Sequence, residues 1–202
     1  MSFLNDLTVG EIVARIGAFL IYSLVQSGLL IGLARLFGDR RPGREGRGSI
    51  SPLVHLSLSG LAMATLFRMG WIRPLRFDVE ANKGGRIGLV LVAVLGLAGM
   101  IVFVALLDYL RPVIQTNLPQ TGGYVVLNVV VQLQQITIGT VVLNILPVPG
   151  LIGAAFLQAA WPKAEPRMRR LEPYFTAALV VLLILGWIPN PMPTLLPYIS
   201  RL

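Results

Sequence analysis

The chain has 202 residues, of which 55% are hydrophobic and 13% charged, and its mean hydropathy is +0.75. This balance excludes an ordinary soluble domain and favours one compact membrane domain over residues 1–202. The absence of cysteine excludes disulfides and thiolate ligands. A net charge of +8 could suggest a nucleic-acid partner, but interleaved aromatic residues and a known binding motif are missing. We therefore expect the lipid bilayer as a partner and no nucleic acid.

Apolar stretches near the ~20 residues that cross a bilayer predict an all-α polytopic membrane protein with about four spanning helices. In chain order the expected elements are a span over 12–37, a re-entrant or interfacial segment over 53–67, a span over 87–110, a span over 124–146, a short helix over 151–161 after a proline break, a span over 174–188 and a proline-rich tail over 189–202. The 53–67 segment is too short to cross comfortably, so a hairpin is expected there.

Lysine and arginine gather in three stretches, 38–48, 68–86 and 163–170, which these spans place on one side of the membrane. The positive-inside tendency predicts that this side is cytoplasmic. Residues 111–123 are then a polar connection on the opposite side. Trp71 is expected at the level of the lipid headgroups, where tryptophan is enriched.

Two prolines and two glycines interrupt the apolar run at 143–153, namely Pro147, Pro149, Gly150 and Gly153. Proline removes a backbone donor and clashes with the preceding turn, so a helix must stop or kink here. Within a bilayer such a break is tolerated only where the freed backbone groups are buried in protein or line a polar cavity. We therefore expect the interior of the molecule here, although a kinked helix of an unrelated membrane protein would show the same residues.

Residues 144–153 resemble the Asn-Leu-Leu-Pro-x-Pro-x-Leu-Asp-Gly signature of the site-2 protease family, the intramembrane zinc metalloproteases. Residues 51–60 are similar to the Asn-Pro-x-x-His-Ile-Asp-Pro-x-Gly segment of the compact bacterial branch of that family. Residues 70–78 are similar to its Gly-Trp-Ala-Lys-Pro-Val-Pro-Val-Asn segment. The three matches occur in the family's order and cover roughly residues 12–160. The resemblance implies a site-2-protease-like helical core in a bacterial inner (plasma) membrane.

The resemblance also implies a zinc ion held by the two histidines of His-Glu-x-x-His and by the aspartate of Leu-Asp-Gly, with the glutamate as general base. Counting back from residues 38–39, which resemble the Gly-Asp after the first family helix, places Gln26, Ser27 and Leu30 at the functional positions of the first motif. Ile152 occupies the aspartate position. We therefore expect a pseudoprotease with no catalytic residue, no metal and no cofactor, in which side chains fill the volume of the metal.

Three amides recur at i, i+4 and i+7 of the span 124–146, on one helix face: Asn128, Gln132 and Gln135. Asn144 extends this candidate polar interaction face. Amides in a bilayer seek partners across a helix interface. Packing against the first span, a ligand pocket and the surface of a partner subunit all remain open for them.

The predicted function is that of an accessory or assembly subunit that packs against other transmembrane proteins in a larger complex. Two alternatives stay open. One is an intramembrane metalloprotease with atypical ligands borrowed from another chain, and the other is a small lipid- or quinone-binding or transport module that uses the amide face and the broken helix. The only histidine, His55, is expected to hold the 53–67 hairpin together, with pH sensing as the alternative.

Overall fold

The computed structural model describes residues 8–49, 51–189, 191 and 195, and this part of the chain is helical or irregular, with no strand. The helices are α1 (Val9–Leu36), α2 (Pro52–His55), α3 (Leu58–Phe67), α4 (Gly85–Asp108), α5 (Leu110–Asn117), α6 (Gln120–Ile145), α7 (Ala154–Ala160) and α8 (Glu165–Ile184), with a π-helical turn η1 (Gly43–Arg47) and a 3-10 turn η2 (Pro162–Ala164). The expected all-α fold is confirmed at this level.

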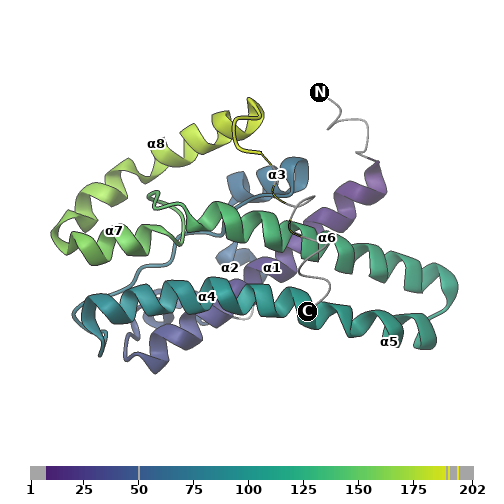
Figure 1. Cartoon of the computed structure of the whole chain (residues 1–202), viewed down its shortest axis with the longest axis horizontal. Coiled ribbons are helices and arrows are strands. Elements are labelled where there is room, and N and C mark those ends of the chain that lie inside the picture. Colours follow the sequence, from purple (N-terminus) through teal and green to yellow (C-terminus); the bar gives the residue numbers. More distant parts are fainter. Residues whose placement is uncertain (1–7, 50, 190, 192–194, 196–202) are drawn as a thin grey trace.

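Within the described residues, three segments are long and apolar enough to cross a membrane: α1, the α4–α5 pair over Gly85–Asn117, and α6. They run side by side in alternating directions, and the end of α1 lies at the same side of the molecule as the start of α4 (Figure 1). These helices support a polytopic membrane protein. The expected fourth span, 174–188, overlaps the second half of α8, which ends at Ile184 and does not meet the same criterion.

Two stretches outside the expected helices, the polar connection 111–123 and the basic stretch 163–170, are largely helical. Residues 110–117 form α5, and most of the basic stretch 163–170 forms the first turns of α8. Pro112 is the third residue of α5 and Pro166 the second residue of α8, where a backbone N–H has no intrahelical acceptor, so proline is tolerated. The expected proline-rich tail at 189–202 lies almost entirely outside the described residues.

Residues 51–80 follow α1 along part of its length and then return. Helices α2 and α3 pack against α1, and the chain turns at Arg68, whose φ is +57°. Residues 69–77 then run back without regular secondary structure. Trp71 was expected at the level of the lipid headgroups, and this prediction is wrong. Only 1% of Trp71 is exposed, and it packs in a cluster with side chains of α3, α6 and α8. Any side chain at Gly60 would collide with the carbonyl oxygen of Trp71, so the close approach of α3 to the returning segment requires glycine.

Polar groups of neighbouring helices form hydrogen bonds with part of the backbone of the returning segment. The Gly70 N–H donates to Thr140 Oγ1 at 3.1 Å, and the Gly70 carbonyl accepts from Asn144 Nδ2 at 3.4 Å. The Arg73 N–H donates to the His55 carbonyl at 2.8 Å. Irregular backbone can lie inside a membrane-embedded bundle only when its hydrogen bonds are made within the protein, and these contacts meet that requirement at Gly70 and at the Arg73 N–H.

Candidate functional site

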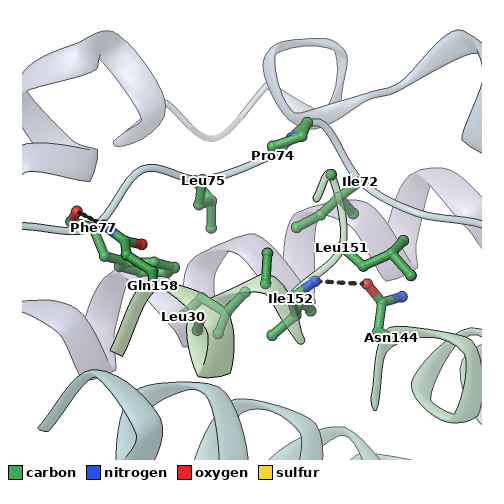
Figure 2. A pocket seen from close by; sticks show the side chains of 12 residues that line it. Leu30, Ile72, Pro74, Leu75, Phe77, Asn144, Leu151, Ile152 and Gln158 are labelled. Atoms are coloured by element: carbon green, nitrogen blue, oxygen red, sulfur yellow. Dashed lines mark hydrogen bonds between the residues drawn. The ribbon is translucent and has the colours of Figure 1, made fainter. Parts of the chain in front are cut away.

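Leu30 and Ile152 line a single cavity of about 50 Å³ between α1, the returning segment and the start of α7. These are two of the positions at which the resemblance places zinc ligands. Figure 2 shows both side chains directed into this cavity, with Ile72 and Leu75 of the returning segment beside them. The volume has room for about one or two water molecules. The first helix and the residues after the proline break therefore meet, and their facing side chains are aliphatic.

Gln26 lies one turn before Leu30 on the same face of α1 and is fully buried. Its Nε2 donates to the Gly96 carbonyl of α4 at 3.5 Å, and its Oε1 accepts from the Tyr22 hydroxyl at 3.4 Å. A side chain at Gly96 would collide with Leu30, so α1 and α4 touch at this point. Ser27 is also fully buried, and its hydroxyl has no hydrogen-bond partner in the part of the chain that the structure describes.

The residues at the expected ligand positions do not fit a zinc ion. Gln26, Leu30 and Ile152 offer one amide and two hydrocarbon side chains, whereas protein zinc sites use cysteine, histidine and carboxylate ligands. Within the described residues, no three His, Cys, Asp or Glu side chains gather into a group that could hold a metal. No step of catalysis by bound zinc can therefore be derived from this donor set.

Asn144 holds the proline loop against the end of α6. Its Oδ1 accepts from the Ile152 N–H at 3.1 Å, and its Nδ2 donates to the Thr140 carbonyl at 2.8 Å. The Asn144 carbonyl accepts from the Gly153 N–H at 2.8 Å. A side chain at Gly153 would collide with the Leu146 carbonyl oxygen, so the loop folds back tightly. The Asn144 side chain thus ties the backbone that follows the proline break, at Ile152, to the end of α6.

Of the four predicted interaction-face amides, Gln132 is also used within the molecule. Its Nε2 donates to Glu11 Oε2 at 2.7 Å, and its Oε1 accepts from Arg68 Nε at 3.4 Å. Glu11 pairs with Arg15 at 3.4 Å, and Arg15 also donates to the Thr65 carbonyl at 2.8 Å. Arg15 is only 2% exposed. The result is a partly buried charged cluster near the start of α1, which includes Arg15 and Arg68, two arginines to which the sequence analysis assigns no site role.

The other two amides of the predicted face are those of Asn128 and Gln135. Asn128 and Gln135 are half-buried, and neither side chain makes a hydrogen bond to another residue that the structure describes. The Gln135 Oε1 is buried as well as unpaired. Because the two residues are seven positions apart, they lie on the same side of α6, about 10 Å apart along its axis.

Gln134, which was not part of the predicted face, is buried in a second polar cluster. Its Nε2 donates to Asp108 Oδ1 at 2.9 Å and to the Val104 carbonyl at 3.1 Å, and its Oε1 accepts from Arg111 at 2.6 Å. Arg111 and Asp108 form an ion pair at 3.0 Å. The sequence signal was the i, i+3 spacing of the two charged residues at the end of an apolar helix, but their amide partner comes from a different helix.

His55 is 1% exposed and lies at the end of α2. Its Nε2 is 3.0 Å from the Ser49 carbonyl, and its own carbonyl accepts from Arg73, as described above. These contacts join the residues before α2 to the returning segment. The geometry supports a role in holding the hairpin together.

No family model matches this chain, and neither a curated protein nor a solved structure does. The kinship with the site-2 proteases therefore stays a prediction that rests on the three motifs.

Proposed function

We propose that the chain is a catalytically inactive, site-2-protease-like protein of a bacterial inner membrane that serves as an accessory subunit for other transmembrane proteins. The observation that carries the proposal is the meeting of Leu30 and Ile152 at one aliphatic cavity. Two positions far apart in the sequence converge where the resemblance expects a metal centre, and neither residue can bind a metal. This combination supports a protein that has kept the site-2-protease-like fold and lost the zinc-dependent activity.

Asn128 and Gln135 support the accessory role. Both lie within α6, one of the helices that can cross a membrane, and both lack a partner among the described residues. Lipid tails offer no hydrogen bonds, so amides at such positions are stabilised by a polar group on another helix. We infer that this face of α6 receives a transmembrane helix of a partner protein.

The test is affinity purification from native membranes in a mild detergent, followed by mass spectrometry of the recovered proteins. We expect a partner to be recovered with the wild-type chain and to be lost from the double variant Asn128→Leu/Gln135→Leu. Each interhelical hydrogen bond contributes about 0.6 to 2 kcal/mol, so removal of two weakens association by roughly tenfold or more. The matched control is Val126→Leu, which adds the same side chain to α6 at a residue that is 39% exposed and lies on the opposite side of the helix from Asn128 and Gln135. This control should recover the partner normally.

Two results would contradict the proposal at different levels. A wild-type chain that is always recovered alone, including after chemical crosslinking in the membrane, would overturn the accessory function. A partner retained equally by the wild type and the double variant would leave that function standing and overturn the assignment of its surface.

A further inference from the structure

A wide hollow of about 490 Å³ opens between the returning segment and the first turns of α8. It is lined by Arg76, Pro166, Arg169, Arg170, Glu172 and Pro173. Three guanidinium groups face one carboxylate, and all three arginines are exposed. The hollow therefore carries a net positive charge of about two, which favours an anion.

The position of the hollow in the molecule indicates which kind of anion can reach it. Figure 1 shows α8 starting at the same end of the molecule as α4, and this end also holds the end of α1. Apart from Glu172, the five residues that follow the two α8 arginines are apolar or aromatic and exposed: Leu171, Pro173, Tyr174 and Phe175. Basic residues followed by exposed aromatic residues are typical of a helix at the boundary between lipid headgroups and acyl chains. On this ground we expect the hollow at the level of the phospholipid phosphates.

The hollow narrows toward the interior of the molecule. A second cavity of about 70 Å³ shares Arg76 and Arg169 with the wide hollow and shares Leu75 and Leu151 with the cavity at Leu30. At this size the inner cavities have room for a few water molecules and not for an acyl chain. A lipid can therefore place only its headgroup in the hollow, while its chains stay on the exposed face of α8.

We propose that this hollow binds the phosphodiester of an anionic phospholipid headgroup through Arg169 and Arg170, with Arg76 adding positive charge from the opposite wall. Guanidinium groups bind phosphate oxygens in a bidentate manner, which a lysine cannot do. Glu172 can accept a hydrogen bond from a headgroup hydroxyl, so phosphatidylglycerol is the probe of choice. The proposal requires a membrane protein but does not depend on the accessory function.

The experiment uses the purified full-length chain in a mild detergent, titrated separately with phosphatidylglycerol, phosphatidylethanolamine and inorganic phosphate, with bound ligand read by native mass spectrometry. We expect phosphatidylglycerol to bind at least about tenfold more tightly than either of the other two probes. In the double variant Arg169→Gln/Arg170→Gln its affinity should fall by about thirtyfold, from roughly fivefold per arginine. The matched control is Lys163→Gln/Arg167→Gln, which removes two exposed basic residues next to the hollow. It should change the affinity by less than about threefold.

Three results would overturn the proposal. Equal losses in the two double variants would mean general surface attraction without a site. Equal binding of phosphatidylethanolamine would remove the preference for an anionic headgroup, and free phosphate that binds as tightly as phosphatidylglycerol would make this a site for a soluble anion. The last two results come from the wild-type chain alone, so they can be obtained even if a variant fails to fold.

Discussion

Asn144→Ala is the substitution that should most directly test how the proline loop is held. The side chain makes its hydrogen bonds to three backbone groups, those of Ile152, Gly70 and Thr140. Truncation to alanine removes all three at once. The Thr140 carbonyl also remains the acceptor of its helical hydrogen bond within α6, so the loss of this contact costs little.

The loss in free energy of unfolding therefore comes mainly from the other two groups, the Ile152 N–H and the Gly70 carbonyl. The Ile152 N–H loses its partner in a buried setting, which costs about 1 to 3 kcal/mol. The contact to the Gly70 carbonyl is long, at 3.4 Å, and its loss costs about 0.5 to 1 kcal/mol. A total of about 2 to 4 kcal/mol is therefore expected, with the lower end applying if water from the adjoining cavity reaches Ile152. For a chain of this size the melting temperature should fall on the order of 10 °C.

The assay is thermal unfolding of the purified chain in detergent micelles, followed by tryptophan fluorescence, to which buried Trp71 contributes. Asn128→Ala is the matched control, because it removes the same amide from the same helix at a residue that has no hydrogen-bond partner in the described part of the chain. It should leave the free energy of unfolding within about 0.5 kcal/mol of the wild type. An Asn144→Ala variant as stable as this control would refute the idea that one amide organises the loop.

Two further predictions concern the same region. Gly153→Ala should lower the free energy of unfolding by about 3 kcal/mol, because the added methyl group would meet the loop backbone. The control is Gly122→Ala, whose methyl group meets nothing within 4 Å and should leave the unfolding temperature unchanged or raise it. Equal stability of the two variants would contradict the tight fold of the loop. Added zinc should not change the melting temperature of the wild type but should raise that of a triple variant carrying Gln26→His, Leu30→His and Ile152→Asp, since metal that binds only the folded state stabilises it. Stoichiometric zinc in the purified wild-type protein would show that the expected loss of the metal site is wrong.

The long apolar helices could be predicted from the sequence because their signal is local. A run of apolar residues near Gly85–Asn117 must be helical if it lies in lipid, whatever surrounds it. The same holds for the proline break, since proline acts on its own backbone and on the turn before it. Prolines that leave a helix intact are harder to recognise. Pro112 and Pro166 resemble turn signals, and only the position of the helix start shows that they lie in a first turn.

Buried polar residues could not be predicted in the same way. Gln134 and Arg15 each sit in an apolar helix, where a lipid-facing, partner-facing or interior position gives the same sequence pattern. What decides between these positions is a partner from a distant segment: Asp108 for Gln134, and the Thr65 carbonyl for Arg15. Trp71 was misplaced for the same reason, because its burial depends on Gly60, which allows α3 to approach it closely.

The hydrogen bonds of Gly70 also constrain the order in which the chain can be assembled during synthesis. The partners of its N–H and carbonyl groups, Thr140 and Asn144, lie 70 and 74 residues further along the chain. At a translation rate of about 5 to 20 residues per second, the ribosome needs roughly 4 to 15 s to reach them. During that interval the nascent Gly70 region cannot enter the hydrocarbon with its polar groups satisfied, so it must stay in water or in the shelter of the insertion machinery until α6 has been made.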